Sequence, residues 1–204
     1  SCMQMRLRPG MATLFSVVII AFFALGSWVL KQGDPKPLAW QATYQDSLWL
    51  PLKEGRLTLA GVDAALGLGS LWMISADGEP LLVSRYPLSS DDLNWRAQAV
   101  IDLNPQQMES LIKAQAWQVD MRDQAVSPAV AAALSGQPVL RMSMIPAEPV
   151  GVEQIIATFG NPDIKLDVRE GDQAWVYGRA GLVVAVAEEQ AHSIMFGLKD
   201  GATP

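Results

Sequence analysis

The sequence predicts an α+β fold. We expect a single N-terminal transmembrane helix, then an extracytoplasmic domain of short helices and antiparallel sheet that ends in a helix plus a four-strand meander. Three observations support this prediction. Residues 11–30 carry no ionisable side chain, apolar and polar residues alternate in several later segments, and proline or glycine separates these segments. The links between the last strands are short, which favours antiparallel neighbours.

The apolar segment 11–30 has the length that an α-helix needs to cross a bilayer core of about 30 Å. Arg6 and Arg8 precede it without a nearby acidic residue, so residues 1–10 are predicted to be cytoplasmic. The predicted location is the inner (cytoplasmic) membrane, with residues 11–30 in the lipid bilayer and the C-terminal domain in the periplasm. A signal peptide cleaved after the small residues Ala24-Leu25-Gly26 is the alternative.

Charge and cysteine content limit the function classes. Beyond residue 30 there are 21 acidic and 13 basic residues, which gives this part a formal charge of −8. Such a surface repels phosphate backbones, so we expect no nucleic acid as partner. The only cysteine, Cys2, precedes the apolar segment, and the outer domain must therefore fold without a disulfide.

The chain beyond the apolar segment divides into three stretches. Residues 31–37 are polar and contain two prolines, which predicts a short spacer. Residues 38–146 are predicted to form an α+β region, although residues 38–59 have aromatic bulk without a clear period. Two prolines within residues 146–149 interrupt the pattern, so residues 147–204 are predicted as a separate helix plus β-meander subdomain.

Alternation and turn residues predict the elements of the first region. Two strands at residues 70–76 and 81–86 flank Asp77-Gly78, a pair suited to a tight hairpin turn. Asn104 and Pro105 are typical of a helix start, and this helix runs to about residue 116. The other predicted elements are strands at residues 95–103, 117–122 and 140–144 and a helix that starts at Ser127-Pro128.

The C-terminal stretch has the clearest pattern. Residues 152–159 predict a short helix that Gly160 ends, and Pro162 prevents its continuation. Four strands are then predicted at residues 164–169, 173–178, 182–187 and 192–198.

The segment GVEQIIATFGNPD, followed by AWVYG and GLVVAV, resembles the small envelope lipoprotein domain of the SmpA/OmlA (BamE-like) type over about residues 150–198. The matching positions are Gly160, Pro162, Trp175, Tyr177 and Gly181. The resemblance implies a helix, a meander and a scaffold role in the cell envelope. The chain departs from that family because no cysteine for lipid attachment follows the apolar segment.

Catalytic patterns are sparse. Ser110 and Lys113 match S-x-x-K, but the companion motifs of penicillin-recognising enzymes are absent, and a solvated helix face explains the pair equally well. The single histidine, His192, lies in a predicted strand beside Ile194 and Phe196, which favours a partly buried structural imidazole. No histidine cluster for a metal is available.

Two further patterns have structural explanations. Asp91-Asp92 after two serines suits a helix N-terminus, with paired carboxylates as the alternative. Gly67-Leu68-Gly69 lacks the third glycine and the preceding strand of a dinucleotide loop. We therefore predict no cofactor, no metal and no catalytic residue.

Aromatic residues offer the only candidate binding residues. Trp40 and Trp49 lie on a segment without a regular period, where they could face a partner, and Trp175 with Tyr177 forms a second candidate pair. The predicted function is a non-enzymatic, membrane-anchored accessory protein that contacts another envelope protein. The alternative is a membrane-tethered hydrolase or small-ligand-binding protein whose site is not visible in the sequence.

Overall fold

The structure, a computed structural model, describes residues 34–199 and corrects the predicted fold class. Within this part of the chain, no helix has both the length and the apolar character needed to cross a membrane. Among residues 34–199 the longest helix, α5 (Pro105–Gln115), has 11 residues, whereas about 20 are needed to span a bilayer core. The prediction of a single-pass transmembrane protein is therefore wrong for the described structure. Residues 11–30, on which it was based, lie outside the described residues.

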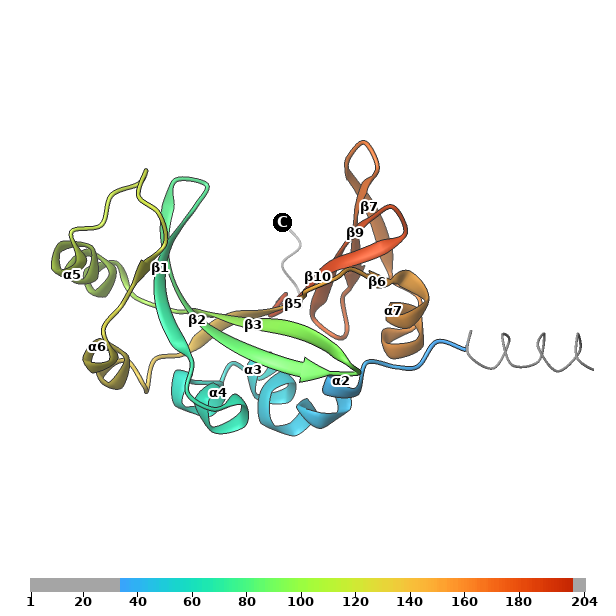
Figure 1. Cartoon of the computed structure of the whole chain (residues 1–204), viewed down its shortest axis with the longest axis horizontal. Coiled ribbons are helices and arrows are strands. Elements are labelled where there is room, and N and C mark those ends of the chain that lie inside the picture. The colour runs from blue at the N-terminus through green and yellow to red at the C-terminus, as the bar shows by residue number, and fades with distance from the viewer. Residues whose placement is uncertain (1–33, 200–204) are drawn as a thin grey trace, which may run out of the picture. The chain divides into compact units, whose positions relative to one another are not determined.

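The fold is α+β and is built on one large antiparallel sheet. Its main path runs in the order β4-β1-β2-β3-β5-β10-β9-β8-β7, and β6 pairs with β10 beside this path. The strands are β1 (Ser70–Ala76), β2 (Glu79–Ser90), β3 (Leu93–Ile101), β4 (Gln124–Ala125), β5 (Val139–Pro146), β6 (Val150–Gly151), β7 (Ile164–Arg169), β8 (Asp172–Tyr177), β9 (Leu182–Ala187) and β10 (Gln190–Phe196). Figure 1 shows the sheet curving from the β1–β2 hairpin to the β7–β10 meander.

Two neighbouring rows of paired residues show that, across the middle of the sheet, one face is covered and the other is open. The first row crosses six neighbouring strands, in the sheet order β2-β3-β5-β10-β9-β8, and each of its residues is buried: Tyr86, Ala97, Met144, Ile194, Val184 and Trp175. The next row is nowhere buried: Arg85, Gln98, Ser143, Met195, Val183, Val176 and Ile164. We call the second side of the sheet the open face. Val83 and Val100, farther along the second side, are buried.

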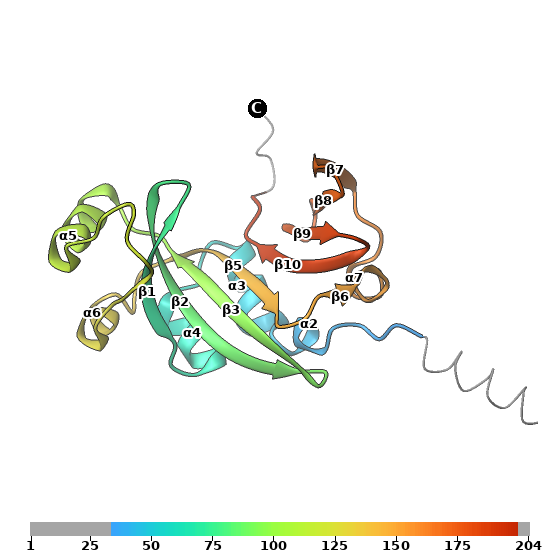
Figure 2. The same cartoon turned by 45° about the horizontal axis from the view of Figure 1, so that its top comes forward.

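Four short helical segments cover the buried face of the first strands. They are α2 (Ala39–Thr43), the π-helix η1 (Gln45–Trp49), α3 (Leu50–Lys53) and α4 (Leu59–Leu66). Figures 1 and 2 show them on one side of β1–β3. Residues 38–59, which have no clear period in the sequence, are therefore mostly helical, and their large side chains pack into the core.

Hairpin turns set the register of the sheet. Three two-residue turns have positive φ at both positions: Asp77-Gly78, Asp91-Asp92 and Glu188-Glu189. This backbone is the one that the right-handed twist of hairpins favours. The predicted role of Asp91-Asp92 at a helix N-terminus is wrong, because the pair joins β2 to β3.

The C-terminal helix and meander agree with the prediction. α7 (Val152–Phe159) ends at Gly160, whose φ of 80° suits glycine. β7, β8, β9 and β10 follow as consecutive antiparallel neighbours. β5 and β6 both pair with β10, so one sheet continues across the proline-rich residues 146–149.

The strand predicted at residues 117–122 is wrong. Only Gln124–Ala125 pairs with β1 in this region, and the residues before it form turns. Trp117 is buried, whereas Val119 and Met121 are exposed. Alternation of apolar residues does not make a strand where no neighbouring strand is available to pair with it.

Candidate functional site

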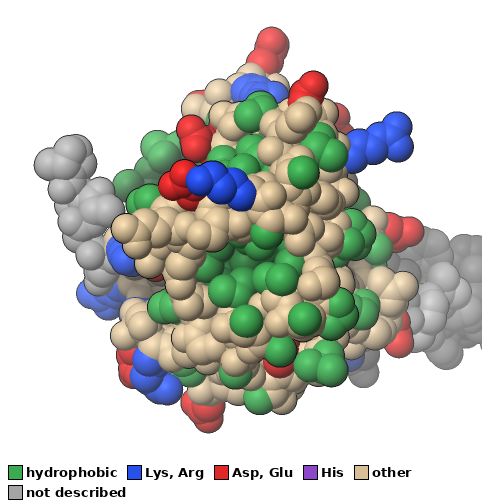
Figure 3. Space-filling view, turned by 90° about the vertical axis from the view of Figure 1, so that its left-hand side faces the viewer, with side chains coloured by type: hydrophobic (Ala, Val, Ile, Leu, Met, Phe, Trp, Pro, Cys, Tyr) green, Lys and Arg blue, Asp and Glu red, His purple; other side chains and the backbone are tan. Residues whose placement is uncertain are grey.

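The candidate binding site is a groove between α5 and α6 (Pro128–Ala133) at the β1 end of the sheet, on the left of Figure 1. Figure 3 faces this end and shows hydrophobic side chains gathered in a hollow. The groove, here called the α5–α6 groove, has a volume of about 420 Å³.

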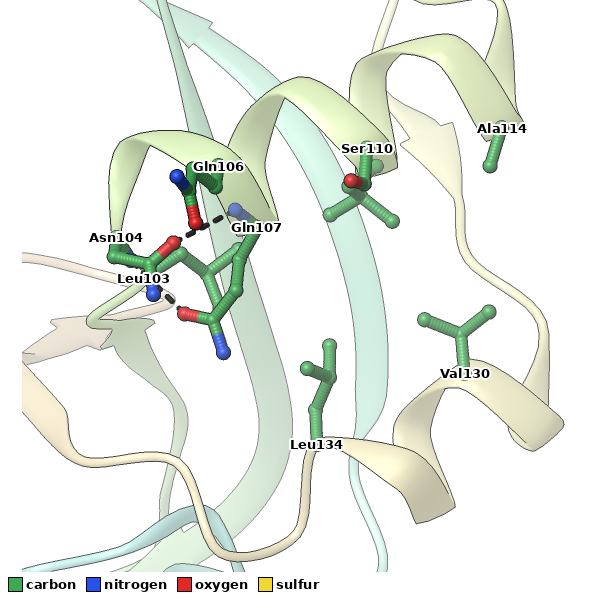
Figure 4. A pocket seen from close by; sticks show the side chains of 9 residues that line it. Leu103, Asn104, Gln106, Gln107, Ser110, Ala114, Val130 and Leu134 are labelled. Carbon is green, nitrogen blue, oxygen red and sulfur yellow. Dashed lines mark hydrogen bonds between the residues drawn. The ribbon is translucent and has the colours of Figure 1, made fainter.

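α5 has a strongly specified start. The Asn104 side chain accepts a hydrogen bond from the Gln107 backbone N–H at 2.8 Å, and the Gln107 side chain accepts one from the Asn104 N–H at 2.9 Å. Figure 4 shows this capping box at one end of the groove. Because both side chains help to start the helix, their acceptor oxygens are already occupied.

α6 has a weaker start. The Ser127 hydroxyl accepts a hydrogen bond from the Val130 N–H at 3.4 Å, and Pro128 occupies the first turn. Val130 and Leu134 point from this helix and its C-cap toward α5 (Figure 4). The two helices thus face each other across a gap that neither fills.

The wall of the groove is apolar at its centre and polar, but uncharged, at its margin. Its lining residues are Leu103, Asn104, Gln106, Gln107, Ser110, Leu111, Ala114, Val130 and Leu134. None of these carries an ionisable side chain, so the groove has no acid, base or metal ligand of its own. Its chemistry suits apolar groups, with Gln106 and Ser110 available for hydrogen bonds at the margin.

Ser110 and Lys113 are not arranged as a nucleophile and a base. Both are exposed, and the Lys113 ammonium forms an ion pair with Glu109 at 3.1 Å. Only Ser110 lines the groove. The solvated-face explanation therefore describes Lys113, while Ser110 contributes a hydroxyl to the groove.

His192 is exposed, so the expectation of a partly buried imidazole is wrong. The pairing of β10 with β9 shifts between Ala191 and Ser193, which places His192 at a β-bulge. The bulge turns the imidazole away from Ile194 and the core. His192 instead borders a second hollow of about 500 Å³ on the open face, together with Val168 and Val183.

The four aromatic residues predicted to bind a partner all lie in the core, so Trp40 and Trp49 do not face outward as expected. Trp40 and Trp49 are 1% and 5% exposed. Trp49 stacks on Phe196 with ring centroids 4.0 Å apart, and Trp40 meets Trp95 edge-on at 5.4 Å. The absence of a period around them reflects partners that lie far along the chain.

Trp175 and Tyr177 are also buried. The Trp175 indole N–H donates to the Gln173 side chain at 3.1 Å, and the Tyr177 hydroxyl donates to the Gly160 carbonyl at 2.9 Å. The second bond ties β8 to the end of α7. Burial raises the pKa of Tyr177 to about 12, with a further contribution from the Asp163 carboxylate.

A second buried phenol anchors α4 to the sheet. The Tyr86 hydroxyl donates to the Asp63 carboxylate at 2.6 Å. Burial, followed by this hydrogen bond, raises the pKa of Tyr86 well above its ordinary value. Because the bond joins α4 to β2, the pair acts as a structural link.

Gly69 has a packing role. A Cβ at Gly69 would lie 2.6 Å from a ring carbon of Tyr86 and 2.7 Å from the Ser84 hydroxyl. The glycine therefore permits close packing of the loop against Tyr86. In the described part of the chain, residues 34–199, no group of three or more His, Cys, Asp or Glu side chains could hold a metal ion.

Comparison of the chain with known protein families, with curated proteins and with solved structures found no match. The resemblance of residues 150–198 to the SmpA/OmlA (BamE-like) domain stays a prediction. The α5–α6 groove was not predicted from the sequence, because it depends on how two helices face each other. The only signal was the small, apolar character of α6.

Proposed function

We propose that this chain is a non-enzymatic interaction protein that binds an amphipathic segment of another envelope protein in the α5–α6 groove. The observation that carries the proposal is the groove itself, which is apolar at its centre and uncharged throughout. An occupant that presents a row of apolar side chains matches this lining.

The arrangement of the groove favours a helical occupant. Grooves between helices bind amphipathic helices through apolar side chains spaced three and four residues apart. Val130 and Leu134 lie one turn apart on one wall, and Ser110 and Ala114 lie one turn apart on the other, so both walls extend over the length of a helical turn. A helix laid between the walls would place its apolar face on Leu111.

The envelope location of the partner is part of the proposal and is supported by the sequence alone. Residues 150–198 resemble an envelope domain, and the strongly acidic composition disfavours nucleic acid. A small apolar ligand is the second candidate occupant, because about 420 Å³ lies within the usual range of about 300 to 1,000 Å³ for small-molecule sites.

Site-specific photo-crosslinking tests the proposal. A photoreactive amino acid at position 110 should give a defined protein adduct in the native cells, because Ser110 is exposed and lines the groove. The matched control position is Ala129, which is exposed on α6 and does not line the groove. It should give no such adduct.

A blocking substitution makes the test specific. Ala114→Arg places a long charged side chain in the groove at an exposed position, so the fold should tolerate it. The adduct from position 110 should then disappear. An adduct that persists, or that forms equally from position 129, would contradict the proposal. A low-mass adduct in place of a protein would favour the small-ligand alternative.

A further inference from the structure

β7 is a free edge of the sheet. It lies at the end of the strand order and has β8 as its one strand neighbour among the described residues. All six of its residues are exposed. An edge strand of this length offers a row of unpaired N–H and C=O groups to another strand.

β7 also exposes a row of large apolar side chains. Ile164, Leu166 and Val168 are 53%, 51% and 63% exposed. Ile164 and Leu166 lie beside Val176 and Ala174 of β8 on the open face, and Val168 lines the hollow on that face. Protein edges are usually protected by charge, by short length or by a bulge. β7 has a bulge between Asp167 and Arg169, but Ile164 and Leu166 lie in the regularly paired part before it, so their exposed apolar side chains indicate a contact surface.

Two of the three charged residues of β7, Lys165 and Asp167, project to the opposite side, whereas Arg169 borders the open-face hollow with Val168. Lys165 lies 4.4 Å from the centre of the Trp175 ring, and Asp167 accepts a hydrogen bond from Gln173 at 3.1 Å. Both line the hollow on the covered side of the sheet. Over Ile164–Asp167 the strand thus has one apolar side and one side with two opposite charges, two residues apart.

We propose that β7 pairs antiparallel with β7 of a second copy of this chain, about a two-fold axis at Leu166. In this register Lys165 lies opposite Asp167 of the second copy, and this ion pair forms twice. Leu166 faces Leu166 of the second copy, and Ile164 faces Val168. Directly opposite residues of opposite charge stabilise an antiparallel pair, and so do opposite apolar residues.

Charge selects this register over its neighbour. An axis at Asp167 would place the two Asp167 carboxylates opposite each other and Lys165 opposite Arg169. Like charges directly opposite destabilise a strand pair. A parallel pairing in register would also place Lys165 against Lys165. An axis at Val168 would place Asp167 opposite Arg169, but it would also place Leu166 opposite Glu170. The register about Leu166 is therefore the one that matches both the charges and the apolar residues of β7.

The opposite end of the sheet is formed by β4, which has two residues and pairs only with Trp72 and Met73 of β1. Pairing through β7 alone uses the same surface on both copies and gives a closed dimer.

Cysteine crosslinking of the 204-residue chain in mild detergent tests the proposal. Leu166→Cys, made with Cys2→Ser, places two thiols at the two-fold axis. Directly opposite residues have Cα atoms about 4.5 to 5.5 Å apart, which a disulfide can bridge. Mild oxidation should give a covalent dimer on a non-reducing gel. The control is Leu68→Cys. Leu68 is 90% exposed but lies on the loop between α4 and β1, away from the proposed two-fold axis, so this variant should crosslink far more slowly.

Charge exchange then tests the register. Lys165→Asp puts two carboxylates opposite each other twice, and should slow the crosslink through position 166 by about tenfold or more. Adding Asp167→Lys restores opposite charges and should restore the rate, while circular dichroism confirms that each variant is folded. Equal crosslinking from positions 166 and 68 would overturn the proposal. The proposal would also be overturned if Lys165→Asp left the rate of the position-166 crosslink unchanged. A folded Lys165→Asp/Asp167→Lys variant that still crosslinks slowly would overturn it as well.

Discussion

Trp40→Ala tests whether the N-terminal helices are part of the core. Trp40 is 1% exposed and meets Trp49, Trp95 and Phe196 edge-on at 5.4 to 5.9 Å. Burial of a tryptophan removes about 200 Å² from water, which is worth about 5 kcal/mol at about 25 cal/mol per Å².

Two corrections lower this figure. The alanine retains part of the burial. In addition, the Trp40 indole N–H is buried without a hydrogen-bond partner among the described residues. Such a donor costs about 1 to 3 kcal/mol, and the substitution removes that cost. We therefore expect a loss of about 3 kcal/mol, at the lower end of the range for tryptophan truncation in cores.

The assay is urea unfolding of residues 31–204, followed by circular dichroism. This fragment contains the compact unit that starts at Pro37. Trp40→Phe is the matched control, because it keeps an aromatic ring and removes the unpaired N–H; its loss should stay below about 1.5 kcal/mol. A Trp40→Ala loss below about 1 kcal/mol would show that α2 is not docked on the sheet and would refute the reasoning.

Three further predictions concern the sheet. Gly69→Ala should destabilise the fold by about 1 to 3 kcal/mol, measured by urea unfolding, because its Cβ would lie 2.6 Å from the Tyr86 ring; unchanged stability would contradict this packing. Because the pKa of Tyr177 is raised from 10.0 to about 12, its stabilising contribution is present below pH 10 and is lost as the pH rises through about 12. Tyr177→Phe should reduce the loss of stability between pH 10 and about 12. An identical dependence of stability on pH in the variant would show that ionisation of Tyr177 does not cause this loss. Replacing Glu188-Glu189 by Asn-Gly should raise the melting temperature, because both turn residues have positive φ and the exchange suits that backbone; a lower melting temperature would contradict it.

Local signals in the sequence predicted the elements that depend on neighbouring residues. The turn at Asp77-Gly78, the helix start at Asn104-Pro105 and the helix end at Gly160 are each specified within a few residues. The alternation from β7 to β10 also indicated strands correctly. These features needed no knowledge of distant contacts.

Features that depend on distant contacts were not predicted. Trp40 and Trp49 are in the core because Trp95 and Phe196 meet them there, and no spacing in residues 38–59 reveals those partners. A bulge of one residue moved His192 to the open face. The α5–α6 groove arises from two helices whose separation is set by the sheet and the loop between them, which periodicity does not report.

The affinity of the crosslinked partner segment for the α5–α6 groove tests the central claim most directly. The segment identified by crosslinking from position 110 would be made as a peptide and titrated into the chain by calorimetry. Ala114→Arg should weaken binding by about tenfold or more, because it introduces an unpaired charge into an apolar groove. Ala129→Arg, on the exposed part of α6, should leave the affinity unchanged. Equal affinity of the wild-type chain and Ala114→Arg would show that the groove is not the binding site.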